Sequence, residues 1–235
     1  PEKVALGSTL FNDKRFSSTG QVSCATCHDE KKAFTDSPLR TSEGIKKDGK
    51  ALTGTRNAPT VVNSAYFDVQ FWDGRSPSLE DQSQHPFINP VEMGLKDHQP
   101  ILKIVRSDPA YVKAFEQVFG KKGAQVTMKE VQQAIGAFER TQVSGNSPFD
   151  RYFYGGESGA VTDAQKRGFD IYVNKGRCVS CHRIEQTQAL FTDNRFHNIG
   201  VGINDIQTEV PGLAEAFLQA KATLAEVDVK VLSDK

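Results

Sequence analysis

Two copies of one short motif, Cys-x-x-Cys-His, constrain this chain more strongly than any other feature of its sequence. All four cysteines lie in these copies, which are Cys24, Cys27 and His28, and Cys178, Cys181 and His182. The spacing is typical of covalent haem attachment, in which two thiols add to the vinyl groups of the haem and the adjacent imidazole binds the iron. We therefore expect two covalently bound haems c, with His28 and His182 as the iron ligands.

Other uses of paired cysteines explain the pattern less well. A redox-active Cys-x-x-Cys pair requires no following histidine, and structural disulfides usually show varied spacings rather than one repeated motif. The two copies could together supply the four ligands of a zinc site. Zinc spacing, however, does not require a histidine directly after the second cysteine of each copy.

The composition indicates a globular protein without a preference for a charged partner. Of 235 residues, 37 % are hydrophobic and 25 % are charged, with 29 acidic against 29 basic side chains. Nucleic acid is therefore not an expected partner. The length suits one large domain or two of about 100 residues each. No apolar run reaches the roughly 18 residues that a membrane-spanning helix needs.

The start of the chain and the haem interpretation together suggest a location. The chain begins at Pro1, without methionine or a signal-like segment, so we expect a processed product. Covalent haem attachment in bacteria takes place outside the cytoplasmic membrane, which predicts a periplasmic protein. This localisation depends on the haem assignment alone.

Helix signals are frequent and strand signals are scarce. In residues 107–120, Asp108 is a candidate N-cap, Pro109 lies in the first turn and Gly120 is a stop signal. Two more helices open with capping boxes, formed by Thr127 with Glu130 and by Thr162 with Gln165. The first of them continues with an apolar stripe at helical spacing, made of Met128, Val131, Ile135 and Phe138. We expect a mainly α protein with little β structure and long loops, such as residues 36–60.

The second half of the chain echoes the first. A Phe-Thr-Asp run follows each haem motif, at residues 34–36 and 191–193. Turn-forming residues cluster at 144–159, which indicates a domain boundary there. We therefore expect two cytochrome c-like haem domains. The N-terminal one would comprise residues 1–145, and the C-terminal one, incomplete, residues 146–235.

Four longer stretches resemble the bacterial di-haem cytochrome c peroxidases and their MauG relatives. They are LGSTLFNDKRFSSTGQVSCATCHD, RNAPTVVNSAYFDVQFWDGR, SLEDQSQHPFINPVEMG and AFERTQVSGNSPFDRY, and the likeness runs in order over nearly all of residues 5–200. In that family two haem domains lie side by side with calcium between them. The resemblance implies that peroxide reacts at the N-terminal haem and that the C-terminal haem carries electrons.

The same resemblance assigns roles around the first haem. Gln82, Pro86 and Glu92 would lie on the distal side, opposite His28. A carboxylate can move a proton between the oxygens of a peroxide, so Glu92 is the expected acid-base residue. Gln82 can orient the peroxide by hydrogen bonding, and Pro86 offers no side chain that could bind the iron. Taken without the resemblance, Glu92 could equally be a solvated loop acid.

Two further residues receive roles from the family. Trp72 is the only tryptophan and would relay electrons between the haems, whereas a lone tryptophan more often fills a core. Asn57 matches a calcium ligand of the family, and an amide oxygen suits this hard cation, although an asparagine before Ala-Pro can also be a turn residue. We therefore expect one calcium ion in addition to the haems.

Two departures place the chain nearer the MauG-like branch. No histidine or methionine lies between His28 and His85, although many of the peroxidases have a distal histidine in this loop. The first haem is therefore expected to be five-coordinate or water-ligated. The lysines of this loop are read as solvated, and His85 is either a ligand or base beside the distal cluster or, more simply, a structural histidine.

The second departure concerns the C-terminal haem. The run NRFHNIGVGIN resembles MauG relatives, and its His197 is expected to be a hydrogen-bonding partner near the second haem, or failing another group its ligand. The family segment that supplies the sixth ligand of that haem has no counterpart before Lys235. Met93 belongs to the distal loop and Met128 to a helix face, so neither is a good substitute.

Three functions fit these residues. The first is a MauG-like oxidoreductase that uses hydrogen peroxide for long-range oxidation of an aromatic residue in a partner protein. The alternative is an ordinary bacterial cytochrome c peroxidase, which reduces peroxide to water with electrons from a small cytochrome c or a cupredoxin. A third reading, from another class, is a non-catalytic di-haem electron carrier, for which both haems would be low-spin at rest.

Overall fold

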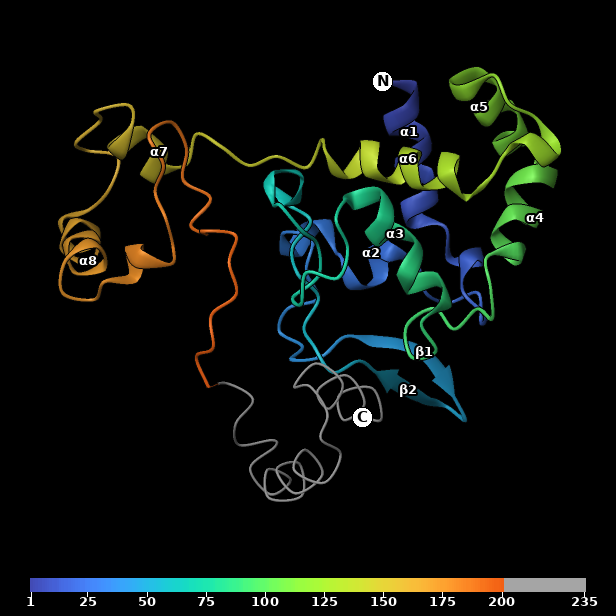
Figure 1. Ribbon diagram of the computed structural model, residues 1–235, viewed down its shortest axis with the longest axis horizontal. Coiled ribbons are helices and arrows are strands. Elements are labelled where there is room, and N and C mark those ends of the chain that lie inside the picture. Colours follow the sequence, from blue (N-terminus) through green and yellow to red (C-terminus); the bar gives the residue numbers. More distant parts are fainter. Residues whose placement is uncertain (201–235) are drawn as a thin grey trace, which may run out of the picture. The chain divides into compact units, whose positions relative to one another are not determined.

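The computed structural model describes residues 1–200. The contacts within the chain divide it into two units, residues 1–194 and residues 195–235, of which only 195–200 are described in the second. The described helices are α1 Glu2–Asn12, α2 Cys24–Cys27, α3 Leu79–Ile88, α4 Gln99–Ser107, α5 Pro109–Phe119, α6 Met128–Glu139, α7 Pro148–Phe153 and α8 Asp163–Val173 (Figure 1). One two-stranded sheet accompanies them in the described part, so the expected mainly α fold with little β structure is confirmed. No helix in residues 1–200 is long and apolar enough to cross a membrane.

Helices α5, α6 and α8 begin where the sequence predicts, and α5 also ends at its predicted stop. α5 begins after Asp108, whose carboxylate accepts a hydrogen bond from the Ala110 amide at 2.9 Å. It ends at Gly120, which adopts a left-handed φ of 66° that favours glycine. The capping boxes expected for α6 and α8 are both formed. These ends depend on residues close in sequence, which explains why they could be predicted.

The core forms where α1, α3 and α6 meet (Figure 1). α1 crosses α6 so closely that a Cβ added at Gly7 would lie 1.9 Å from the carbonyl oxygen of Ala134, and only glycine permits this approach. The predicted stripe of α6 faces this core, because Val131 and Ile135 are fully buried and Met128 and Phe138 pack against it. Large apolar side chains fill the remainder, among them Leu10, Phe11, Phe16, Phe87, Ile101 and Phe115.

The stretch at residues 36–60 is not entirely a loop. It contains strand β1 (Glu43–Lys47) and strand β2 (Lys50–Thr53), which pair antiparallel in a hairpin (Figure 1). Asp48 and Gly49 connect the strands, both with positive φ, as an Asp-Gly two-residue turn requires. The sequence did not predict this hairpin, because lysines occupy many of its strand positions. The strands therefore lack the alternation of apolar and polar residues that marks a half-buried strand.

The segment that carries the second Cys-x-x-Cys-His motif has its own aromatic cluster. α7 begins at Pro148, inside the stretch expected to consist of turns, and α8 leads to the motif as predicted. Rings of α7 and α8 pack on one another, with Phe149 and Phe153 5.4 Å apart and Phe149 and Phe169 5.5 Å apart between centroids. The expected domain boundary between residues 145 and 146 stays a prediction.

Candidate functional site

The first Cys-x-x-Cys-His motif lies on α2, a single helical turn. Ser23 and Thr26 form a reciprocal capping box at its start, and the His28 amide donates a hydrogen bond to the Cys24 carbonyl at 3.0 Å at its end. One turn of helix brings the two cysteines and the histidine to the same short segment. Neither these two cysteines nor the two of the second motif form a disulfide.

The His28 ring is held in the state that iron ligation requires. Its Nδ1–H donates to the carbonyl oxygen of Phe34 at 3.0 Å, because a carbonyl can only accept. The proton therefore resides on Nδ1, and Nε2 keeps its lone pair for a metal. Burial lowers the pKa of His28, which favours the neutral imidazole. The residue thus fits the predicted role of axial ligand.

The second motif repeats this arrangement. The His182 Nδ1–H donates to the carbonyl oxygen of Phe191, also at 3.0 Å. Phe34 and Phe191 have nearly the same left-handed backbone, with φ of 56° and 54°. Both belong to the Phe-Thr-Asp runs of the sequence, so the echo between the two halves has a structural meaning: in each half this run supplies the carbonyl that orients the histidine.

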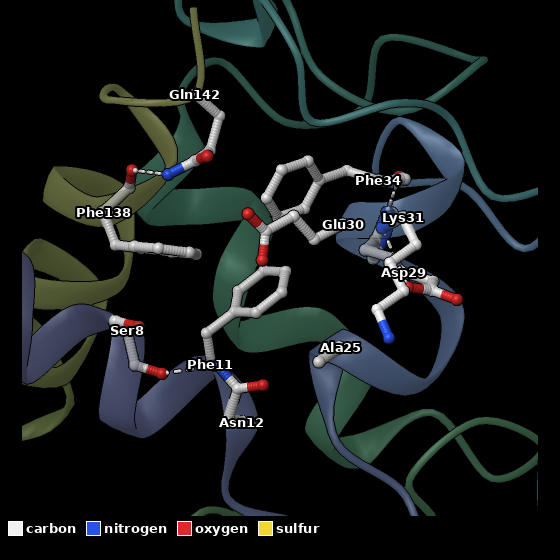
Figure 2. A pocket seen from close by; sticks show the side chains of 11 residues that line it. Ser8, Phe11, Asn12, Ala25, Asp29, Glu30, Lys31, Phe34, Phe138 and Gln142 are labelled. Atoms are coloured by element: carbon white, nitrogen blue, oxygen red, sulfur yellow. Dashed lines mark hydrogen bonds between the residues drawn. The ribbon is translucent and has the colours of Figure 1, made fainter.

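A cavity of about 570 Å³ adjoins His28, which is within the range of cofactor sites. Figure 2 shows the rings of Phe11 and Phe34 facing this space, with Phe138 and Gln142 on one side and Asp29 and Lys31 on the other. The three aromatic rings and the imidazole of His28 share this lining with polar side chains, and neither Cys24 nor Cys27 belongs to it. The residues that fit a covalently attached haem are therefore those of the motif itself, Cys24, Cys27 and His28, with the histidine oriented by Phe34.

Glu92 is a half-buried acid of the same neighbourhood. Strand β1 connects it to the motif, since the Ile45 amide donates to the Glu92 carbonyl oxygen at 2.9 Å and the Cys27 thiol donates to the Glu43 carbonyl at 3.8 Å. The side chain of Glu92 accepts a hydrogen bond from Asn89 at 2.8 Å. Burial raises the pKa of Glu92, although nearby Arg75 opposes the shift. The acid is thus biased towards its protonated form.

Gln82 and Pro86 lie four residues apart on one face of α3, and neither lines the cavity beside His28. The two histidines of this region have other partners. His85 Nε2 lies 3.4 Å from the Asp81 carboxylate, and His98 Nε2 donates to the Gln84 carbonyl at 3.0 Å. These contacts favour the structural reading of His85.

The two methionines take no part in a site. Met93 is 2 % exposed and belongs to the apolar core, and Met128 packs against that core at the start of α6. The C-terminal tail that follows residue 200 lies outside the described residues.

Trp72 and Asn57 are joined by a hydrogen bond. The Trp72 indole Nε1–H donates to the Asn57 carbonyl oxygen at 2.8 Å, and the Asn57 side-chain amide donates to the Leu39 carbonyl at 2.8 Å. Trp72 is 59 % exposed, so in the described chain it does not fill a core. Beside Asn57 lies Asp36, which is 4 % exposed and whose Oδ2 has no hydrogen-bond partner in the structure.

The second motif is more open than the first. Cys178 and His182 are exposed among the described residues, whereas Cys24 and His28 are half-buried. The Tyr172 hydroxyl donates to the His182 carbonyl, which ties α8 to the motif. His197 lies beyond residue 194, in the second unit, so its expected place near the second haem stays a prediction. In the described residues there is no group of three or more histidine, cysteine, aspartate or glutamate side chains that could hold a metal ion.

One residue of this site was missed by the sequence reading. Glu139, the last residue of α6, is 6 % exposed, and the electrostatic effect of its carboxylate reaches the Cys24 thiol. A signal for it existed, because Val131, Ile135 and Glu139 follow one another at intervals of four residues and so share the buried helix face. The predicted stripe contains only the hydrophobic residues of this face and so leaves out the buried acid.

Comparison with known proteins supports the haem assignment. Residues 1–158 match the family model of the di-haem cytochrome c peroxidases. The chain is 36 % identical over 207 residues to the methylamine utilization protein MauG of Methylophilus methylotrophus, which covers 87 % of this chain and 58 % of that protein. It is 38 % identical over 183 residues to the cytochrome c peroxidase Ccp of Escherichia coli, covering 77 % and 37 %.

A solved structure shows the same fold. The crystal structure of a MauG-like protein associated with microbial copper homeostasis superposes with a TM-score of 0.70 at 31 % identity, covering 84 % of this chain and 56 % of that one. The chain spans about half the length of the curated relatives it matches. Proteins of this family are di-haem cytochromes, for which covalently bound haem c is implied. With two Cys-x-x-Cys-His motifs that orient their histidines alike, the chain belongs to the di-haem cytochrome c peroxidase family.

Proposed function

We propose that the chain is the haem-binding part of a peroxidase-type oxidoreductase that acts on hydrogen peroxide at the first motif. Cys24 and Cys27 would hold the haem and His28 would bind its iron, which supplies the redox chemistry when bound. The corresponding residues of the electron-transferring second haem are Cys178, Cys181 and His182. The overall reaction consumes one peroxide, two electrons and two protons and yields two waters.

The observation that carries this proposal is the pairing of a fixed imidazole with a half-buried acid. The bond of His28 Nδ1 to Phe34 leaves Nε2 as the nitrogen that can bind a metal, and Glu92 lies close enough to add to the effect of burial in raising the pKa of the Cys24 and Cys27 thiols. Peroxide cleavage requires that a proton leave the inner oxygen and reach the outer one. An acid with a raised pKa, such as Glu92, can hold that proton and deliver it.

The other distal residues assist without competing for the iron. We assign to Gln82 the orientation of the peroxide by its side-chain amide, and to Pro86 the maintenance of an open face. His85 and His98 have partners of their own at Asp81 and Gln84, which supports an open position on the iron of the first haem. A non-catalytic electron carrier would gain nothing from such a position.

Trp72 is proposed to relay electrons between the two haems. Its exposed ring and its bond to Asn57 support this role. Asn57 would connect the relay to a calcium site, because its backbone carbonyl accepts the Trp72 hydrogen bond and its side chain is the proposed ligand. For that ion we propose the side-chain oxygen of Asn57, with the unpartnered Asp36 carboxylate oxygen adding negative charge beside it. Covalent haem attachment makes the periplasm the proposed location.

Between the two peroxidase-type functions we favour the MauG-like one, in which an aromatic residue of a partner protein supplies the electrons. The absence of a histidine between His28 and His85 supports it, because the ferric protein would then be ready to react. The alternative remains a cytochrome c peroxidase that takes electrons from a small cytochrome c or a cupredoxin. Both use the same distal residues.

Rapid mixing of the fully oxidised holoprotein with one equivalent of hydrogen peroxide tests the proposal. We expect an immediate change of the haem absorption spectrum, which Glu92→Gln slows by 100-fold or more and Glu116→Gln, at an exposed acid of α5, leaves unchanged. A protein that reacts only after one haem is reduced is an ordinary cytochrome c peroxidase. A protein inert in both states, with both haems low-spin, is an electron carrier.

A further inference from the structure

We propose that Glu139 is the proton-holding group of the first haem site, which takes up a proton when that haem gains an electron and releases it when the electron leaves. The proposal concerns a residue outside the distal set of Gln82, Pro86 and Glu92. It rests on the proposed attachment of haem at the first motif, and it does not depend on peroxide chemistry.

The Glu139 carboxyl is buried without the contacts that a buried charge needs. It is 6 % exposed, and its Oε2 has no hydrogen-bond partner in the structure. A carboxylate withdrawn from water without compensation is strongly disfavoured, so such a group is retained in its neutral form. Burial and the charge of Glu80 raise the pKa of Glu139 to about 8.

Arg140, the cation whose charge acts on Glu139, is already engaged. Arg140 donates to both oxygens of Glu80, from Nη1 to Oε1 at 2.5 Å and from Nη2 to Oε2 at 2.8 Å. This bidentate pair between α6 and α3 satisfies the guanidinium and places a second carboxylate near Glu139. Glu139 is also the last residue of α6, where the helix dipole is negative and disfavours an anion. Fold stability therefore gives no reason for an acid here.

The carboxyl is close to the place where the haem would be attached. The charge of Glu139 raises the pKa of the Cys24 thiol, second only to the effect of burial itself. In the holoprotein the Cys24 sulfur would carry the haem, so a charge that acts on this sulfur would also act on the haem. Phe138, directly before Glu139, and Gln142, three residues after it, line the cavity beside His28.

The charged and titratable groups that face Glu139 come from three elements. Glu80 of α3 raises its pKa, Arg140 at the C-cap of α6 lowers it, and the thiol of Cys24 on α2 would become a neutral thioether when haem is attached. A unit of negative charge added at the haem therefore stabilises the protonated form of Glu139 further, by Coulomb repulsion in a medium of low dielectric constant. Electron uptake and proton uptake reinforce one another for this reason.

The coupled step is balanced. When a haem held by Cys24, Cys27 and His28 gains one electron from an electrode or an electron-donor protein, the Glu139 carboxylate would take one proton from solvent to become the carboxylic acid. In such a one-electron, one-proton step the midpoint potential falls as the pH rises, by up to 59 mV for each tenfold change in proton activity. The fall is expected around and above pH 8, because the carboxyl of the folded chain ionises near this value.

Spectroelectrochemical titration of the holoprotein over this pH range measures the effect without peroxide. The signal of the first haem is assigned with a Cys178→Ser, Cys181→Ser background that lacks the second. We expect a sloping potential in the wild type, a flat one in Glu139→Gln and a retained slope in Glu139→Asp. Glu130→Gln is the matched control on the same helix, because the pKa of Glu130 is about 2 and this acid stays ionised throughout the range.

Three results would overturn the proposal: a flat potential in the wild type, an unchanged slope in Glu139→Gln, or a slope that Glu92→Gln removes instead. If Glu139→Gln does not incorporate haem, redox-difference infrared spectroscopy of the wild type above pH 8 decides, since a carboxylic-acid C=O band of the reduced protein must disappear on oxidation at this pH and shift with 13C-labelled glutamate. Failure of the peroxide reaction with an intact Glu139 slope would refute the proposed function alone.

Discussion

Replacing Glu139 with glutamine should flatten the pH dependence of the unfolding free energy between about pH 4.5 and pH 8. The pKa of Glu139 rises from an ordinary 4.5 to about 8 in the folded chain, mainly because the carboxyl is buried. Between these values the folded state holds a proton that the unfolded state has lost. Stability therefore falls as the pH rises through this window, and the loss stops once the folded carboxyl also ionises.

The size of the effect follows from the shift. A difference of 3.5 between the folded and unfolded pKa values (8 minus 4.5) corresponds to about 5 kcal/mol across the window, at about 1.4 kcal/mol for each unit. This is a large part of the stability of an ordinary domain. Glutamine keeps the shape of the side chain and never ionises, so the variant should be nearly as stable at the upper end of the window as at the lower end.

Urea unfolding of the holoprotein, followed by far-ultraviolet circular dichroism at several pH values within the window, measures this slope. Glu130→Gln provides the reference, because the pKa of Glu130 lies below the window and its ionisation state does not change there. A Glu139→Gln protein that loses stability as steeply as the wild type would refute the reasoning. The carboxyl would then have to be ionised in the folded protein at neutral pH.

Two further predictions concern the same helix packing. Glu130, whose Oε1 lies 2.6 Å from Lys121 Nζ, has its pKa lowered to about 2 by this partner and by Thr127. Glu130→Gln should therefore lower the unfolding free energy by at most about 3 kcal/mol at neutral pH and leave it unchanged near pH 2, because this stability is lost as the pH falls below 4.5. Acid unfolding curves measure this difference. An equal loss at neutral pH and near pH 2 would contradict the prediction. Gly7→Ala should lower the unfolding free energy by about 1–3 kcal/mol or more, because the new methyl group would clash with the backbone of α6. A thermal midpoint equal to that of the wild type would contradict this prediction and show that α1 can move away from α6.

Much of the fold was predictable because it is encoded locally. The first residues of α5, α6 and α8 follow from capping residues within one turn of the helix start. The two haem motifs are also contiguous, so their chemistry could be inferred before the fold was known. The sequence shows the two Phe-Thr-Asp runs but does not indicate that their phenylalanine carbonyls orient His28 and His182.

The parts that could not be predicted depend on contacts between distant segments. Nothing near Glu92 in the sequence indicates that strand β1 links it to Cys27, and the hairpin itself has no regular apolar pattern. Gly44 permits this contact, because a Cβ there would lie 1.9 Å from the Val91 carbonyl oxygen. The place of Glu92 in the site thus depends on how 43–47 packs against 91–92.

Helix α6 contains two buried glutamates whose surroundings are opposite. Glu130 lies in the first turn, where the helix dipole favours an anion, and Lys121 and Thr127 complete its contacts. Glu139 lies in the last turn, where the dipole disfavours an anion, and Arg140 is turned towards Glu80 instead. One acid therefore stabilises the fold by being charged, whereas the other is tolerated only when it is neutral. A group kept neutral in this way, next to the cysteine that would carry the haem, is able to exchange a proton when the charge of the haem changes.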